Sequence, residues 1–301
     1  MLSALFAISA LYALFYKIYY FINTNMNTKI TVKGIILIIS CNKFIETRLK
    51  EFVLSKVEYN GWKVVIIIGN PLLKLKTEMQ YELSVNDNNQ QIITLRCEDS
   101  YIHLMKKLVI GIEVLFNIYD IKEGILRCCD DLVFNEDKLS AFLHNNTVKK
   151  DYMGVIANDN RNIIKKYDPF MPKYFDSHRD DLFNPLNGIH LTFDEISVMN
   201  EVPSCNYAGG VIFYLSKRSC KLLISHMNAI KWDIFYKDYE HGYPYIIEDV
   251  GVGYILNLND IYPVSCELYT DNVYDNSNSN NSNNSNNSNA ITFAYHTNKY
   301  K

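Results

Sequence analysis

The chain has 301 residues, a formal net charge of -3 at pH 7 and ordinary shares of hydrophobic (48%) and charged (21%) residues. This length allows one large hydrophobic core or two modest ones. The slightly acidic balance argues against a nucleic-acid surface, and the sequence has no basic stripe with interleaved aromatic residues. The seven cysteines include no CxxC pair, so neither a zinc site nor a disulfide framework is expected, and Cys128 and Cys129 are predicted to be reduced thiols.

Residues 1–22 are apolar or aromatic apart from two serines and Lys17, and such a run is long enough to span a bilayer as a helix. A cleaved signal peptide would have basic residues before its apolar run, and none precedes this one. We therefore predict a single transmembrane anchor, with a signal peptide as the alternative. Lys17, Lys29 and Lys33 lie late in the run or after it, which by the positive-inside rule favours a cytosolic C-terminal part. Residues 23–33 would form a short stem.

The first half of the chain after the stem alternates between strand-like and helix-like segments. Continuous apolar runs of strand length are typical of strands that are covered on both faces, whereas apolar residues at helical spacing indicate helices. This alternation predicts an α/β fold with a mainly parallel sheet flanked by helices. In chain order the expected elements are strand 34–40, helix 43–57, strand 64–68, a polar irregular stretch at 74–91, strand 92–95 and helix 99–117.

The stretch 124–135 would add the next strand of this sheet. Its apolar run ends in Asp130 and Asp131, so a buried strand would deliver two adjacent carboxylates to its C-terminal edge. Ligands bind at that edge in open α/β sheets. Adjacent carboxylates repel each other and need a cation, a basic partner or water. The plain alternative is a solvated Asp-Asp turn.

Three segments in the second half each allow a structural and a functional interpretation. Gly209 and Gly210 precede an apolar strand-like run, either as a simple turn or as a place where backbone approaches a ligand. Glu248 and Asp249 begin an apolar helix, either as its N-cap and a favourable charge at its dipole or as site residues. His296, near the end of the chain, is either an ordinary surface or core residue or a ligand.

The remaining segments complete the expected architecture. Residues 135–144 and 217–227 are predicted to be helices, and 152–157 a strand. The span 158–203 is polar and weakly periodic, and an irregular stretch of this length is more often functional than idle. Residues 271–289 form an Asn/Ser run that cannot build a core, so we expect an inserted flexible loop there.

Taken together, these motifs resemble the β-1,3-galactosyltransferase and Fringe-like glycosyltransferases from about Gly34 to His296. The order and spacing of short segments carry the resemblance. They are an early helix with Arg48, an Asp-Ser-Tyr helix from Asp99 with a lysine at Lys107, a basic-x-Asp-Asp-Asp-like segment at 127–131, a Gly-rich strand with Gly209 and Gly210, and an acidic Glu-Asp-Val-x-x-Gly motif from Glu248.

The resemblance implies a GT-A (Rossmann-like) fold over residues 34–301, a UDP-linked sugar as the donor, a divalent cation that is usually Mn²⁺, and inversion at the anomeric carbon. Matched by position, Asp131 and His296 would bind the metal, and a carboxylate with an imidazole suits Mn²⁺. Asp249 would be the general base, with Glu248 as the second candidate. The residues implied in donor binding are Arg48, Asp99, Lys107, Asp130, Gly209 and Gly210.

One position departs from the family pattern: Cys129 stands where the family has its first Asp, which usually contacts the ribose or sugar of the donor. A thiol makes only a weak hydrogen bond, so the departure concerns donor choice more than metal binding. Two hypotheses follow. One is a membrane-anchored, metal-dependent hexosyltransferase that moves a galactose or N-acetylhexosamine type of sugar, and the other is a catalytically weakened sugar-nucleotide or glycan-binding protein. The acidic charge and lack of a basic groove disfavour a two-metal nuclease.

The resemblance also bears on location and partners. It implies a single-pass protein of a Golgi or ER type of endomembrane with a luminal catalytic domain, which acts on a nucleotide sugar and a glycan or protein acceptor. The lysine count alone favours the cytosolic orientation. Asn145-Asn146-Thr147 is an acceptor pattern for N-glycosylation and can report which orientation holds.

Overall fold

The computed structural model describes residues 29–51, 54–73, 81–145, 149–158, 163–164, 202–203, 205–232, 234, 245–270 and 292–296. The predicted anchor at 1–22, the insertion at 271–289 and most of the span 158–203 lie outside these residues. Within the described ranges, no helix combines the length and the apolar character needed to cross a membrane.

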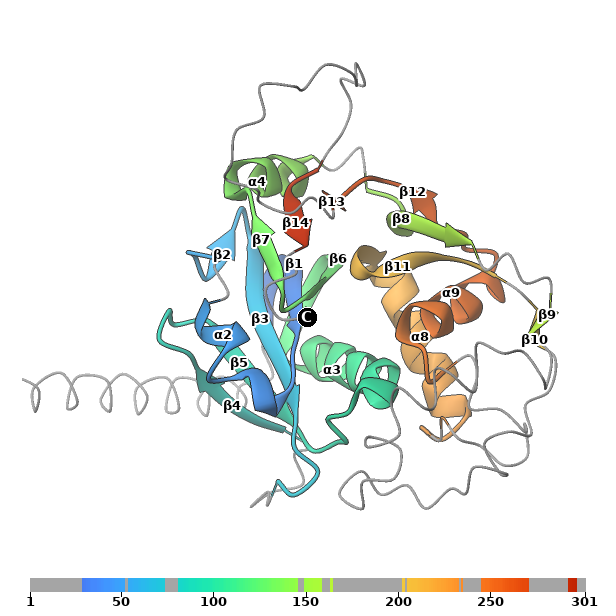
Figure 1. The fold of residues 1–301 in the computed structure, drawn as a ribbon, viewed down its shortest axis with the longest axis horizontal. Helices are drawn as coiled ribbons and strands as arrows, with labels where there is room; N and C mark the ends of the chain where they lie inside the picture. Colours follow the sequence, from blue (N-terminus) through green and yellow to red (C-terminus); the bar gives the residue numbers. More distant parts are fainter. Residues whose placement is uncertain are drawn as a thin grey trace, which may run out of the picture.

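A nine-stranded mixed sheet forms the centre of the molecule (Figure 1). Its middle strands run parallel, as the alternation of elements predicted: β1 (Ile30–Ile39) lies between β3 (Trp62–Gly69) and β6 (Tyr119–Cys129), and β5 (Gln91–Leu95) follows β3. The full order is β12-β8-β11-β6-β1-β3-β5-β4, with β2 paired to β3. The outer strands are β2 (Glu58–Tyr59), β4 (Tyr81–Val85), β8 (Tyr152–Asn158), β11 (Asn206–Ser216) and β12 (Val264–Ser265).

Antiparallel pairing enters at both sides of this parallel core. The strand β11 is antiparallel to both β6 and β8, and β4 is antiparallel to β5. Two small sheets complete the described strands. They are β9 (Ile163–Ile164) with β10 (Val202–Pro203), and β7 (Leu132–Phe134) with β14 (Ala294–His296) and β13 (Tyr269–Thr270).

The apolar run of β1 serves two cores because successive side chains of a strand point to opposite faces. Ile35 and Leu37 belong to one core, and Ile36 and Ile38 belong to the other. The helices α3 (Leu104–Ile118), α8 (Lys217–Ala229) and α9 (Glu248–Asn257) contribute to the first core, and α4 (Glu136–His144) and the β7/β14 sheet contribute to the second (Figure 1). The molecule is therefore layered, with the large sheet in the middle.

Two predicted segments differ from the structure. The helix expected at 43–57 is reduced to the 3-10 turn η1 (Asn42–Phe44) and the single turn α2 (Arg48–Glu51). Just beyond it, the Ser55 N–H donates to the carboxylate of Glu136 at 2.6 Å, so a distant side chain satisfies a backbone donor that a helix would have used. The stretch 74–91, expected to be irregular, contains the edge strand β4.

Candidate active site

A cavity of about 450 Å³ lies at the C-terminal ends of β1 and β6. This is the edge of the sheet at which the sequence predicted two carboxylates and a ligand site. The cavity draws together segments that are far apart in the chain. Of the predicted site residues, all except Gly209 line it: Arg48, Asp99, Lys107, Asp130, Asp131, Gly210, Glu248, Asp249 and His296.

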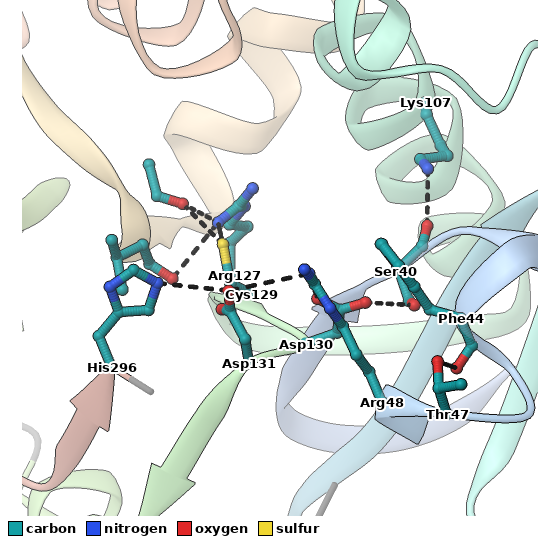
Figure 2. A network of polar contacts seen from close by, with 12 residues as sticks. Ser40, Phe44, Thr47, Arg48, Lys107, Arg127, Cys129, Asp130, Asp131 and His296 are labelled. Carbon is teal, nitrogen blue, oxygen red and sulfur yellow. Dashed lines mark hydrogen bonds and ion pairs between the residues drawn. The ribbon is translucent and has the colours of Figure 1, made fainter. Parts of the chain in front are cut away.

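Asp130 is held in place by the parallel pairing of β1 with β6. The register sets Ile39, the last residue of β1, opposite Cys129, the last residue of β6. The residues that follow them, Ser40 and Asp130, therefore meet at the sheet edge. The Ser40 hydroxyl donates to Asp130 Oδ2 at 2.6 Å, and Arg48 Nη1 donates to Asp130 Oδ1 at 3.0 Å (Figure 2). Asp130 is only 7% exposed, so the interpretation as a solvated turn is wrong for this residue.

Asp131 lies between two basic side chains (Figure 2). His296 Nε2 is 3.3 Å from Asp131 Oδ2, and Arg48 Nη1 is 3.8 Å from the same oxygen. The antiparallel pairing of β14 with β7 sets His296 opposite Leu132, the residue that follows Asp131, which explains how the chain end reaches the site. Burial alone would raise the pKa of Asp131, but the hydrogen bond and charge of His296 and the charge of Arg48 hold it below its usual value.

The surroundings of Asp131 fit a divalent cation. Its Oδ1 atom is buried and has no hydrogen-bond partner among the described residues. This carboxylate oxygen is therefore available as a metal ligand. A carboxylate together with an imidazole is a set of ligands that suits Mn²⁺. The described part of the chain gathers no group of three or more His, Cys, Asp and Glu residues placed to hold a metal ion. A cation on Asp131 and His296 would therefore complete its coordination with diphosphate oxygens and water.

Glu248 forms a buried ion pair with Arg127, the basic residue that precedes the adjacent cysteines. Arg127 Nε donates to Glu248 Oε1 at 2.8 Å, and Arg127 Nη2 donates to Glu248 Oε2. Burial raises the pKa of Glu248 to about 7, and the Arg127 guanidinium opposes this rise. Because both carboxylate oxygens face the guanidinium, Glu248 is poorly placed to take a proton from a substrate.

Asp249 has a different environment from its neighbour. Its Oδ2 accepts a hydrogen bond from the Gly210 N–H at 2.9 Å, and its Oδ1 accepts one from the Val250 N–H at 2.9 Å. Burial raises the pKa of Asp249, and these backbone hydrogen bonds oppose the rise. Ile247 is the N-cap of α9, so the interpretation of the two acids as the cap is wrong, although both lie in the first turn.

The two predicted glycines lie inside β11, where its register with β8 shifts, and not before the strand. A Cβ atom on Gly210 would lie 3.3 Å from Asp249 Oδ2, so the glycine allows the strand backbone to reach this carboxylate. A Cβ on Gly209 would have its nearest neighbour, the Val155 carbonyl oxygen, at 3.7 Å. Of these two glycines, Gly210 lines the cavity and Gly209 does not.

Asp99 and Lys107 fix the loops that surround the cavity. Lys107 is 1% exposed, and its Nζ lies 2.8 Å from Asp99 Oδ1 and 2.6 Å from the Ser40 carbonyl oxygen. Asp99 also accepts hydrogen bonds from the backbone N–H groups of Gly69 at 2.7 Å and Asn42 at 2.5 Å. Their polar groups are engaged within the protein, and the donor contact expected from the resemblance stays a prediction.

Cys129 occupies the centre of this arrangement. Its Sγ lies 3.1 Å from Arg127 Nη1 and donates to the Gly210 carbonyl oxygen at 3.3 Å. All seven cysteines lie in the described part of the chain and none forms a disulfide, as predicted. Burial raises the pKa of Cys129 to about 11, so the thiol is neutral at physiological pH.

The residues that line the cavity but were not predicted as site residues include Ser40, Phe44 and Tyr101. The position of Ser40 at the end of the first apolar run was a usable signal, because parallel strands end at the same edge. Phe44 lies under the Arg48 guanidinium, with 3.9 Å from the ring centroid to Cζ. Tyr101 belongs to the Asp-Ser-Tyr segment, of which only Asp99 and Lys107 were selected.

A model of the galactosyltransferase family matches residues 55–267, more than two thirds of the chain. The matched range includes Asp130, Asp131 and Asp249, whereas His296 lies beyond it. A comparison with curated proteins gave no match. The mixed α/β fold and the cavity at the end of β6 agree with the family match. The chain belongs to the galactosyltransferase family and is a glycosyltransferase.

Proposed function

We propose that the protein is a metal-dependent inverting hexosyltransferase of the GT-A type. It would move a galactose or N-acetylhexosamine type of sugar from a UDP-linked donor to a hydroxyl of a glycan or protein. One observation carries the proposal: the same cavity holds the Asp131–His296 pair and the half-buried Asp249 carboxylate, and Asp131 has a buried oxygen with no hydrogen-bond partner among the described residues.

Asp131 and His296 would hold the cation. When bound, the cation would act as a Lewis acid that stabilises the negative charge developing on the leaving nucleoside diphosphate. Arg48 supports the same task, because its guanidinium lies 3.0 Å from Asp130 and 3.8 Å from Asp131 and balances their charge. After His296, Arg48 also lowers the pKa of Asp131 and so favours the ionised form, in which a carboxylate binds metal.

Asp249 would act as the general base. Inversion requires a proton acceptor for the attacking hydroxyl on the face of the sugar opposite the leaving group. The hydrogen bonds from Gly210 and Val250 fix the orientation of the Asp249 carboxylate, and burial raises its pKa toward the working range of a base. A large shift is unnecessary, because the hydroxyl becomes acidic as the new bond forms.

The test is a screen of sugar nucleotides with the purified full chain, which needs no known acceptor. We expect Mn²⁺ to stimulate release of the nucleoside diphosphate from one class of donor, and EDTA to stop it. Asp131→Asn should abolish the stimulation, because it removes the charge that binds the metal. Asp137→Asn, an exposed acid in α4 outside the cavity, is the matched control and should behave like the wild type. Full Mn²⁺ stimulation in Asp131→Asn would reject the metal site.

Cys129 supports a second candidate function, that of a sugar-nucleotide-binding protein with weakened catalysis. A neutral thiol stands in the position of the family's first Asp and hydrogen-bonds to protein groups. Calorimetry on the same donor panel separates the two candidates. Tight donor binding without any turnover would favour the binding protein, and binding followed by nucleotide release would favour the enzyme.

A further inference from the structure

Arg127 is buried in the wall of the cavity, and its guanidinium has protein partners on two sides. The residue is 1% exposed, although it carries a full charge. Its Nε and Nη2 atoms face the two carboxylate oxygens of Glu248, in the first turn of α9. Its Nη1 atom faces β11, where it donates to the carbonyl oxygen of Gly210 and, at 3.3 Å, to that of Val211. One side chain of β6 therefore joins α9 to β11.

Arg127 holds a part of β11 that lies outside the strand registers. The register of β11 with β6 runs from Ile212 to Ser216, and its register with β8 is interrupted between Ala208 and Phe213. Residues 209–211 fall outside both registers. Because backbone carbonyl groups need hydrogen-bond donors, the guanidinium supplies here what a neighbouring strand supplies along the rest of β11.

Gly210 is also the residue that orients Asp249. Its N–H donates to Asp249 Oδ2 at 2.9 Å, while its carbonyl oxygen accepts a hydrogen bond from Arg127 Nη1. Asp249 follows Glu248 in the chain, and the other side of the same guanidinium holds Glu248. Arg127 is thus connected to Asp249 by two routes: the strand that donates to the carboxylate, and the helix turn that carries it.

The two routes require the shape of an arginine. A guanidinium presents five N–H donors in one rigid plane, so it fixes the spacing between its partners on α9 and on β11. Its plane is held in turn, because Cζ lies 5.4 Å from the centroid of the Phe213 ring and Nη1 lies 3.1 Å from Cys129 Sγ (Figure 2). A lysine would keep the charge, but its single nitrogen cannot occupy both sides at once.

We infer that Arg127 is a positioning residue for Asp249, which sets the spacing of α9 and β11 at which the Gly210 N–H meets the Asp249 carboxylate. The inference rests on the proposed function where it concerns catalysis, because it takes Asp249 as the base. In this role Arg127 touches no substrate, so its replacement should lower the rate and leave donor binding intact. A misplacement of about 1 Å can cost about a hundredfold in rate.

The first test measures the hydrogen bond between Gly210 and Asp249 and needs no turnover. Amide hydrogen exchange of the full chain is followed by mass spectrometry with fragmentation that resolves Gly210, and the amides of β1 report global opening. In Arg127→Lys, the Gly210 amide should exchange at least about tenfold faster than in the wild type, with β1 unchanged. Arg218→Lys is the matched control, because Arg218 pairs with Asp151 at 3.2 Å outside the cavity. Its exchange at Gly210 should equal that of the wild type.

A second variant keeps this test decisive if Arg127→Lys does not fold. Arg127→Met combined with Glu248→Leu replaces the buried ion pair by apolar side chains, which folded proteins often tolerate without loss of stability. The guanidinium and its contacts with β11 are absent, so exchange at Gly210 should again be faster. Wild-type exchange at Gly210 in either folded variant would overturn the inference. Equally faster exchange in β1 would also overturn it, because the role of Arg127 would then be in overall stability.

The kinetic test uses donor hydrolysis by the full chain. Arg127→Lys should lower kcat about tenfold and leave the donor KM within about twofold of the wild type. In an Asp249→Asn background the same change should cost nothing further, because no base is left to position. A raised KM with unchanged kcat, or a full additional loss in that background, would overturn the inference. If the wild type hydrolyses no donor, the proposed function fails, and exchange at Gly210 still decides whether Arg127 positions Asp249.

Discussion

At the scale of single residues, Glu248 and Asp249 divide two tasks between adjacent positions. Glu248 neutralises Arg127 in the core, and Asp249 lines the cavity with its carboxylate oriented by backbone N–H groups. The resemblance selects Asp249 as the base by position, but the residue types alone do not distinguish the two neighbouring acids. The ion pair joins residues 121 positions apart, so only the folded chain reveals which carboxylate is engaged.

Asp249→Asn tests this division. Loss of the proton acceptor should lower sugar transfer by about a hundredfold or more. Donor binding should persist, and the melting temperature should fall only modestly, because the amide oxygen can keep one of the two backbone hydrogen bonds that the carboxylate accepts. In the wild type, activity should fall on the acid side of the pH profile, because a protonated Asp249 cannot act as a base. Burial raises this pKa, so the fall should begin at higher pH than for an ordinary aspartate.

Glu248→Gln provides the contrast to that variant. It leaves the Arg127 charge buried without its counter-ion, which should cost about 3–5 kcal/mol of unfolding free energy. Thermal and urea denaturation measure this loss directly. If Glu248→Gln is as stable as the wild type while Asp249→Asn is not, the assignment of the two acids must be reversed.

At the scale of elements, the middle of the sheet follows from the sequence and its borders do not. The continuous apolar runs of β1, β3 and β6 correctly predicted buried parallel strands. The edge strand β4 was missed because its residues are only half-buried or exposed and mix polar with apolar types, although Tyr81, Leu83 and Val85 alternate with exposed residues. The helix predicted at 43–57 was wrong in extent, because contacts with α4 override local periodicity.

The same limit applies to the site. The strand end carrying Asp130 and Asp131 could be predicted, because an apolar run that stops at paired acids indicates a sheet edge. The partners of these acids could not, since Ser40, Arg48 and His296 reach them through strand register and loop packing. The resemblance to a family supplied Arg48 and His296 by position, and Ser40 and Tyr101 needed the structure.

The strand β11 carries a prediction that compares its two glycines. Gly210→Ala would place a Cβ atom 3.3 Å from Asp249 Oδ2 and push the carboxylate aside by a few tenths of an ångström. Because such misplacement weakens catalysis steeply, we expect turnover to fall about tenfold. Gly209→Ala has its nearest contact at 3.7 Å and should retain wild-type turnover. An equal loss of turnover in the two variants would mean that any side chain at this part of β11 disturbs the site, whatever its distance from Asp249. A raised donor KM in Gly209→Ala alone would instead support the donor contact expected from the resemblance.

At the scale of the whole molecule, the predicted membrane anchor bears on how the cavity meets its acceptor. The described chain begins at Lys29, immediately before β1, whose C-terminal end carries the cavity. An anchor that precedes β1 would therefore join the domain at the sheet edge opposite the active site. This arrangement would leave the cavity accessible to large acceptors, since a parallel sheet binds ligands at its other edge.

Deletion of residues 1–22 tests the anchor. The shortened chain should become soluble and keep donor hydrolysis, whereas the full chain should resist extraction by carbonate. Orientation is read at Asn145, which is exposed at the end of α4 and begins an Asn-x-Thr acceptor. Glycopeptide mass spectrometry should find a glycan there if the domain is luminal, and Asn145→Gln should remove it. The variant is needed because the run 271–289 contains Asn-x-Ser triplets of its own. An unmodified Asn145 in a membrane-bound, active full chain would instead support the cytosolic orientation that the lysine count favours.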